Sequence, residues 1–356
     1  MKLKEVDNHD DFISLRDSWQ GVLQRCDHSI FSTWEYLSTW WKYYGKGAKL
    51  RVLIAQENEE TLSIAPLMLS KHAFSHLGGL HKLQFLGHGS DYADFILPKK
   101  NSKCLDLFLD NLLQSSDWDI LELEGINEES TTVKALLDIR NHHTPELELN
   151  DWSSCSYIRL SDSFKDFMNG LSRNVRKNLD RRMRRLKESY NVEFKTQNDF
   201  DSVRVAMETF FNLHDKRWKS KGEAGVFATE VNRDFHISLA ETFNEKGWLS
   251  LYFLTIDDVP ISAAYTFDYD MKKYGCLTGF DPDFRHFGIG NLLKMHVIEE
   301  CFRKQFREYD LGRGSEPYKT EWATGVRKNL AMGMTKRGWR LPLLLWISNI
   351  KKHLHA

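Results

Sequence analysis

The sequence predicts an α+β protein of two domains, each a mixed, mainly antiparallel sheet flanked by helices. The chain has 356 residues, which is long for one hydrophobic core. In the second half, three β-rich runs at 248–256, 261–269 and 272–280 are joined by short turns and followed by a helix and a strand. The first half shows a weaker form of the same order. We place the boundary in a polar segment and predict domains over 1–155 and 156–356.

The first domain is expected to alternate strands with two helices. Apolar residues at helical spacing predict helices over 31–41 and 104–114. Runs rich in β-branched and aromatic residues between turn-forming segments predict strands over 50–56, 61–69, 81–87, 91–97 and 118–125.

The second domain is expected to begin with helices. From Phe164 to Leu186 apolar residues recur every three or four positions, with a break at Gly170 and an N-cap at Ser172. The pattern further predicts a strand over 191–197, helices over 200–219, 232–245 and 290–302, and a strand over 307–311.

Composition excludes several classes of protein. Hydrophobic residues make up 41% and charged residues 28%, as in soluble globular proteins, and the net charge of -1 gives no general attraction for nucleic acid. The five cysteines form no CxxC pair, His142 and His143 are adjacent, and no HExxH occurs, so we expect no metal. Neither a signal peptide nor an apolar run of spanning length is present, which favours a cytoplasmic protein.

A glycine motif marks the start of the helix over 290–302. Gly288 and Gly290 let backbone N–H groups approach an anion, and the helix N-terminus adds positive potential. A pyrophosphate is the natural ligand; the plain alternative is a glycine-rich turn that only starts a helix. The preceding antiparallel strands exclude a dinucleotide fold, and no GK[ST] follows as a P-loop requires. The predicted donor-binding residues are Arg285, Phe287, Gly288, Ile289, Gly290 and Asn291.

This arrangement of strands, RHFGIG motif and helix resembles the acyl-CoA motif of the GNAT superfamily. The segments LHDKRWKSKGEAGVF (213–227), GFDPDF (279–284) and EYDLGRGSEPYKTEWATG (308–325) resemble its CelD-like branch, and the similarity covers roughly residues 20–326. It implies two GNAT-like halves, acyl-CoA on the second half as co-substrate, with acetyl-CoA as the expected form, and the acceptor between the halves. Such proteins are associated with polysaccharide or envelope biosynthesis. The first half lacks an RxxGxG motif, so one donor site is expected.

Acyl transfer needs a way to move protons and to stabilise developing negative charge. The segment after the strand over 307–311 offers such groups beside the expected thioester. Tyr318 could protonate the leaving thiolate, Lys319 could stabilise negative charge, and Asp310 and Glu316 could orient them or act as base. The alternative is a solvated loop.

Acceptor-binding candidates come from two segments. His214 and Trp218 share a helix face at i and i+4, and Arg217 beside them could bind a carboxylate or phosphate, although a structural His is equally expected. In the first half, Asp91, Tyr92 and Asp94 follow glycines and could orient a hydroxyl or amine, or simply form a turn.

Two further features leave alternatives open. The helix over 173–187 carries eight cationic residues, which indicate a solvated face or an auxiliary anion site. If the face is only solvated, Arg181, Arg182 and Arg185 are expected to be dispensable for binding of the donor. The tail over 335–356 has basic residues around a short apolar run, as expected either of packed final elements or of peripheral contact with an anionic membrane.

The sequence therefore predicts an acyltransferase that acts on an amine or hydroxyl of a small-molecule, nucleotide-linked or lipid-linked sugar or another cell-envelope precursor, with no DNA partner. An aminoacyl-tRNA-dependent peptidyltransferase of Fem type is the first alternative. Intact Gly288 and Gly290 count against it, because Fem-type proteins usually lack a working CoA loop. A non-catalytic anion-binding protein of the same fold is the second alternative.

Overall fold

The computed structural model describes residues 1–74, 78–98, 102–142, 147–160, 163–314 and 316–336. The tail predicted over 335–356 lies almost wholly outside these residues. Within the described part of the chain, no helix is long and apolar enough to cross a membrane. The same residues contain no group of three or more His, Cys, Asp or Glu side chains that could hold a metal ion.

The chain divides into two compact units. Unit 1 comprises Met1–Ser153 together with the chain from Lys328 on, and unit 2 comprises Ser154–Arg327. The chain passes from unit 1 to unit 2 within β6 (Glu148–Arg159) and returns within β12 (Gly325–Thr335). The predicted boundary at 155 falls in β6. The segment over 328–335, assigned from the sequence to the second domain, pairs with β5 of unit 1.

Unit 1 contains a mainly antiparallel sheet in the order β1-β2-β3-β4-β5-β12. Its only parallel neighbours among the described strands are β4 and β5, which pair at Lys82↔Ile120 and Leu83↔Leu121. The strands besides β12 are β1 (Lys2–Val6), β2 (Lys49–Glu57), β3 (Glu60–Phe74), β4 (Gly78–Phe85) and β5 (Ile120–Asn127). The helices are α1 (His9–Ser14), α2 (Arg16–Leu23), η1 (Ile30–Ser32), α3 (Trp34–Tyr44), α4 (Ser102–Gln114) and α5 (Thr131–His142).

The segment predicted as a strand over 91–97 is a loop in the structure. Among the described residues, its backbone pairs with a strand only through the single bridge Ile64↔Ile96, and a second bridge, Cys26↔Pro98, follows it. Left-handed backbone at Gly87, Gly89 and Tyr92 explains the difference, because positive φ interrupts an extended strand.

Unit 2 contains the sheet order β6-β11-β10-β9-β8-β7, antiparallel except between β10 and β11. The strands besides β6 are β7 (Val192–Thr196), β8 (Leu249–Ile256), β9 (Val259–Tyr269), β10 (Lys272–Phe280) and β11 (Glu308–Arg313). The helices are α6 (Phe164–Gly170), α7 (Arg173–Ser189), η2 (Gln197–Asp199), α8 (Val203–Lys219), η3 (Val226–Ala228), α9 (Glu230–Glu245), η4 (Pro282–Phe287), α10 (Ile289–Arg303) and α11 (Pro317–Thr320).

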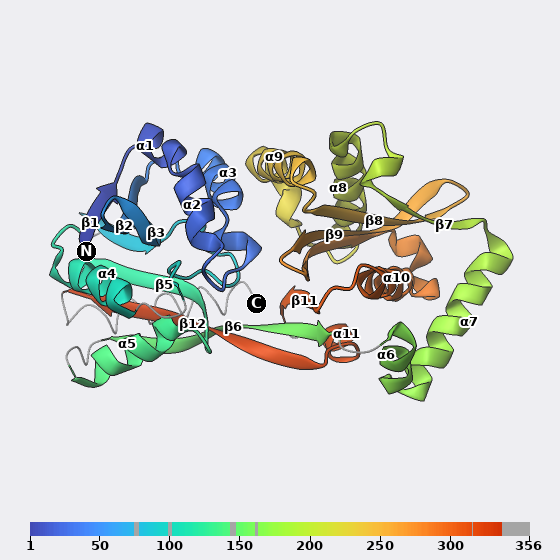
Figure 1. Ribbon diagram of the computed structural model, residues 1–356. Coiled ribbons are helices and arrows are strands. Elements are labelled where there is room, and N and C mark those ends of the chain that lie inside the picture. Colours follow the sequence, from blue (N-terminus) through green and yellow to red (C-terminus); the bar gives the residue numbers. More distant parts are fainter. Residues whose placement is uncertain (75–77, 99–101, 143–146, 161–162, 315, 337–356) are drawn as a thin grey trace. The chain divides into compact units, whose positions relative to one another are not determined.

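Helices cover both faces of the sheet in unit 2. In Figure 1, α8 and α9 lie on one side of β8 and β9, and α10 lies on the other. On the α10 face, Leu254, Leu292 and Val297 are fully buried in one hydrophobic cluster. Together with the antiparallel strands, this arrangement confirms the predicted α+β class, and it places the N-terminus of α10 and the C-terminus of β10 side by side.

Candidate donor and acceptor site

The glycine motif forms a sharp junction between two helices. Gly288 ends η4 and caps α10 with left-handed backbone, φ 64° and ψ 37°. Its carbonyl accepts the amides of Asn291 and Leu292 at 3.0 and 3.2 Å. The amides of Ile289 and Gly290 donate to no other described residue. Two N–H groups at a helix N-terminus are therefore available to an anion.

Some side chains around this junction are buried in the core, and others lie at the surface. Phe287 and Ile289 are 7% and 1% exposed and pack into the hydrophobic cluster, so only their backbone can reach a ligand. A Cβ added at Gly290 would meet nothing within 4 Å, which shows that the space in front of the first turn is open. Arg285 is exposed and Asn291 is half-buried beside it.

The basic helix α7 reaches the same junction. A Cβ at Gly288 would lie 2.5 Å from Nη1 of Arg182, so the guanidinium of Arg182 rests directly on this glycine. The guanidinium carbon of Arg185 lies 5.7 Å from the ring centroid of Phe287. Arg181 instead donates to Oδ1 of Asn178 at 2.9 Å within its own helix. Arg182 is therefore close enough to the junction to contact an anion bound there, and the sequence left an auxiliary anion site open beside a solvated face.

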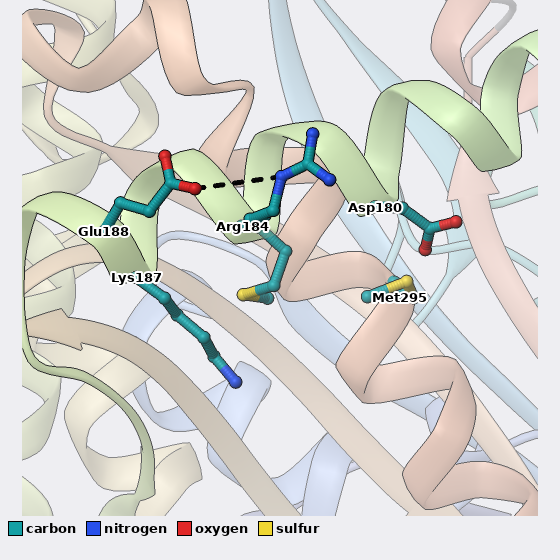
Figure 2. Close-up of a pocket in the computed structure, with 6 residues that line it drawn as sticks. Asp180, Arg184, Lys187, Glu188 and Met295 are labelled. Carbon is teal, nitrogen blue, oxygen red and sulfur yellow. Dashed lines mark ion pairs between the residues drawn. The ribbon is translucent and has the colours of Figure 1, made fainter.

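A shallow groove of about 420 Å³ runs between α7 and α10. Figure 2 shows Met295 on the α10 side and a charged rim on the α7 side, where Nε of Arg184 lies 3.8 Å from Oε1 of Glu188. The lining residues are Asp180, Met183, Arg184, Lys187, Glu188 and Met295. None of the predicted site residues lines this groove.

An opening between β10 and β11 lies next to the glycine junction. The two strands pair only from Lys272↔Glu308 to Tyr274↔Asp310, although β10 continues to Phe280. Gly312 has φ 72°, and a Cβ there would lie 2.8 Å from the Gly275 carbonyl, so the strands touch at these glycines and then part. Beyond this point, β10 pairs with no described strand on the β11 side.

Arg217 occupies part of that edge. From α8, its Nη1 donates to the carbonyl of Thr278 at 3.1 Å and to the hydroxyl at 2.6 Å. The guanidinium also lies over the ring of Phe280 at 5.3 Å. These contacts hold Arg217 against β10, and its role in binding a ligand stays a prediction.

The predicted catalytic segment folds around Lys319. Its Nζ donates to the carbonyls of Gly312 (3.2 Å) and Arg313 and lies 3.1 Å from Oε2 of Glu316. Because an ammonium group has three donors, these contacts use all of them. Lys319 is only 5% exposed, so it fixes the loop after β11 at the mouth of the opening.

Asp310, Glu316 and Tyr318 take different places in this segment. Asp310 is 1% exposed, and its Oδ1 accepts the Gly312 amide at 2.7 Å. Glu316 is partly exposed; burial opposes ionisation, but hydrogen bonds from its own backbone and from Lys319 lower its pKa. Tyr318 belongs to α11, and its side chain lies outside the described part of the structure.

His214 packs into the protein, and Trp218 is partly buried beside it. The ring of His214 is fully buried against Phe227 at a centroid distance of 4.7 Å and near Trp218 at 5.9 Å. Burial lowers the pKa of His214 to about 4, so the ring is neutral near pH 7. In this conformation His214 presents no surface to an acceptor.

Asp91 and Tyr92 belong to unit 1, whereas all other predicted site residues belong to unit 2. Their loop packs on its own sheet, because a Cβ at Gly125 of β5 would lie 2.8 Å from the Ser90 carbonyl. Asp94 accepts from Oγ1 of Thr132 at 2.6 Å and from the Phe95 amide at 2.7 Å, and burial raises its pKa to about 6. In unit 1, the chain that follows β4 thus packs on β5 through Ser90.

One enclosed lysine of unit 2 was missed from the sequence. Lys294 lies one turn after Gly290 in α10, between buried Leu293 and partly buried Met295, and its Nζ is enclosed. Burial and then the charge of Lys319 lower its pKa to about 7, while Glu316 and Glu321 oppose the shift. The sequence could have indicated this residue, because a lysine among the apolar positions of a helix is unusual. The regular apolar spacing drew attention to the helix instead of to the lysine.

Comparison with known proteins agrees with this geometry. Residues 173–320 match the family model for an acetyltransferase (GNAT) domain, whereas comparison with curated proteins gives no match. A crystal structure of FemX has a TM-score of 0.68 at 12% identity and covers 98% of this chain and 100% of that chain.

Two further structures share the fold. The C-terminal domain of a putative lysylphosphatidylglycerol synthetase from Agrobacterium fabrum has a TM-score of 0.55 at 9% identity, covering 94% of this chain and 96% of that one. A tandem GNAT protein from the clavulanic acid biosynthesis pathway has a TM-score of 0.50 at 10% identity, covering 93% and 98%. Residues 173–320 therefore match the model of a GNAT acetyltransferase domain, and the chain has a fold that is shared with these FemX and tandem GNAT structures.

Proposed function

We propose that the protein transfers an acyl group from acyl-CoA, with acetyl-CoA as the expected form, to an amine or hydroxyl of a nucleotide- or lipid-linked sugar or another cell-envelope precursor. The observation that carries this proposal is the junction at Gly288, where two available amides, an open first turn and the guanidinium of Arg182 converge. These groups fit a pyrophosphate, because they combine backbone donors, positive helix potential and a nearby cation.

The opening between β10 and β11 gives the rest of the donor a place to lie. The unpaired edge of β10 offers backbone donors and acceptors to an extended, amide-bearing chain, in the way that sheet edges bind peptides. When bound, acyl-CoA supplies an activated thioester. The residues of the opening, Arg217, Lys294 and the loop held by Lys319, would then orient the acceptor and handle its proton.

Calorimetry with acetyl-CoA and acetyl-pantetheine tests the donor assignment. We expect acetyl-CoA to bind at least a hundredfold more tightly, because acetyl-pantetheine lacks the pyrophosphate and nucleotide that the junction would hold. Equal affinities for acetyl-CoA and acetyl-pantetheine, or no binding of either compound, would contradict the proposed donor site. Mass spectrometry of products formed from a panel of sugar precursors, with hydroxylamine treatment to cleave esters, then separates N- from O-acylation.

The aminoacyl-tRNA-dependent alternative draws support from the similarity to the FemX structure, which extends over nearly the whole of both chains. Incubation with aminoacyl-tRNA and with acetyl-CoA in parallel distinguishes the two. Transfer from aminoacyl-tRNA, with no binding of acetyl-CoA, would favour the alternative. Binding of acetyl-CoA without turnover on any acceptor would instead favour a non-catalytic anion-binding protein.

Arg182→Gln is expected to weaken acetyl-CoA binding by about threefold to tenfold, since it removes one partly exposed charge from the junction. Arg181→Gln is the matched control, because Arg181 is bonded to Asn178 within its own helix. Calorimetry should find the control within about twofold of the native chain. Equal acetyl-CoA affinities of the two variants would show that Arg182 belongs to a solvated face and does not contact the donor.

Lys319→Ala is expected to slow acyl transfer at least tenfold and to leave acetyl-CoA affinity within about threefold. The side chain ties Gly312, Arg313 and Glu316 together, so its loss frees the loop that borders the reacting groups. Steady-state kinetics with the acceptor identified above measures both quantities. Native turnover in a folded Lys319→Ala variant would exclude this loop from catalysis.

A further inference from the structure

The cationic residues of α7 do not all lie at the glycine junction. The helix carries eight Lys and Arg residues against Asp180 and Glu188, a net charge of +6, whereas the whole chain has a net charge of -1. Arg182 lies against Gly288, on one side of the helix. Residues three, four or seven positions apart share a helix face, which places four of the cations together on another side. These four, here called the α7 stripe, are Arg173, Lys177, Arg184 and Lys187.

The α7 stripe lies on the exposed side of the helix. Figure 1 shows α7 along the edge of unit 2, where it packs on η4 and α10. Leu179 and Leu186 are buried in the hydrophobic cluster on the packed side, whereas all four residues of the stripe are exposed. Among the described residues, Arg184 alone of the four forms an ion pair, with Glu188 at 3.8 Å, and these two side chains are 72% and 64% exposed. The stripe therefore presents charges over about 21 Å of helix with little compensation from the chain itself.

The groove between α7 and α10 runs beside the stripe. Arg184 and Lys187 belong to both, and the groove is also lined by the apolar side chains of Met183 and Met295 (Figure 2). A phospholipid carries an anionic phosphate next to apolar chains, so it matches a cationic rim beside an apolar lining. Sites for single-stranded RNA instead carry aromatic side chains on which bases stack, and no residue that lines the groove is aromatic.

We propose that the α7 stripe docks the protein on an anionic phospholipid membrane, with the groove taking the apolar part of one lipid beside the stripe. An extended surface of negative charge meets all four cations at once, whereas a small anion reaches only one or two of them. Each Lys or Arg near such a surface contributes about fivefold in affinity. This inference goes beyond the proposed function and does not depend on the binding of acetyl-CoA.

Flotation of the full chain with lipid vesicles tests the docking. We expect binding to vesicles of phosphatidylcholine with about one third phosphatidylglycerol at about 0.1 M salt. Binding to pure phosphatidylcholine should be at least thirtyfold weaker, and about 1 M salt should abolish binding, because it shortens the range of the attraction to about 3 Å. Equal binding to both kinds of vesicle, or no binding to either, would overturn the proposal.

Replacing the whole stripe with Gln should weaken binding to the anionic vesicles at least thirtyfold, because four contacts of about fivefold each are lost. The matched control removes the same charge from four exposed lysines of unit 1 and should stay within about threefold of the native chain; these are Lys2, Lys4, Lys103 and Lys134. An equal loss in both variants would show that overall charge, and not the stripe, determines binding. Arg184→Gln with Lys187→Gln alone should weaken binding about tenfold or more, which keeps the test decisive if the fourfold variant does not fold.

Two further measurements separate a membrane from other partners of the stripe. Met183→Gln places a polar group in the groove and should weaken vesicle binding by about threefold, and unchanged binding would contradict the role of the groove. Fluorescence anisotropy with a single-stranded RNA oligonucleotide should show weaker binding than the anionic vesicles at the same salt concentration. Tighter binding of the RNA, lost in the stripe variant, would overturn the proposal in favour of a nucleic-acid site.

Discussion

Gly290→Glu is expected to fold at least as stably as the native chain and yet to bind acetyl-CoA at least a hundredfold more weakly. Open space surrounds this position, so the side chain meets no steric obstacle. A carboxylate in the first turn of α10 interacts favourably with the helix dipole, and any residue other than glycine lowers the backbone entropy of the unfolded chain. The same carboxylate occupies the amides of the junction and repels the pyrophosphate, which we expect to cost about 3 kcal/mol of binding free energy.

Gly290→Ala separates charge from backbone effects. It should raise the free energy of unfolding by about 0.5–1 kcal/mol and leave acetyl-CoA affinity within about threefold. Urea denaturation and calorimetry on the three proteins give both quantities. An acetyl-CoA affinity of Gly290→Glu equal to that of Gly290→Ala would place the donor elsewhere in the protein.

The fold of unit 2 was largely predictable because its elements have regular periods. The three strands predicted over 248–256, 261–269 and 272–280 correspond closely to β8, β9 and β10. By contrast, β6 was read as a polar boundary, because its first half is only partly buried and carries Asn150 and Asp151 among its polar residues. Hydrophobic periodicity is weak in such a strand, and only its pairing partners define it.

The candidate site was predictable where local sequence determines geometry. Gly288 adopts the left-handed backbone that glycine favours, and it lies where a strand-to-helix junction was expected. By contrast, Arg182 contacts Gly288, a residue more than 100 positions later in the chain. This contact depends on how α7 packs on unit 2, and no local sequence pattern predicts such packing. The contacts of Lys319 with two backbone carbonyls likewise depend on the path of the loop after β11.

A pair of buried histidines should make unit 2 sensitive to acid. His236 of α9 lies 5.1 Å from Phe227 between ring centroids, and the same phenylalanine packs on His214 at 4.7 Å. Both ring nitrogens of His214 and Nδ1 of His236 are buried and form no hydrogen bond with another described residue. Burial lowers the pKa of His236 to about 3, helped by His214, and lowers that of His214 to about 4.

The sign of the effect follows from comparing the folded and unfolded chains. Both histidines have folded pKa values below the ordinary value of 6.5, so the unfolded chain takes up protons first as the pH falls. Stability is unaffected above about pH 7, declines below pH 6.5, and levels off only below the folded pKa values. At pH 5 each histidine is expected to reduce the free energy of unfolding by about 2 kcal/mol, from 1.5 pH units at about 1.4 kcal/mol each.

His236→Phe keeps a ring in the same place and removes its titration. Urea denaturation at pH 7.5 and pH 5.0 should therefore show a loss of stability that is about 2 kcal/mol smaller in this variant than in the native chain. His286→Gln is the control, because it removes a histidine that is exposed. The comparison uses the difference between the two pH values, so any packing cost of the larger ring cancels. An equal loss in the native chain and in His236→Phe would show that acid acts on unit 2 through other groups, of which His214 is the next to replace.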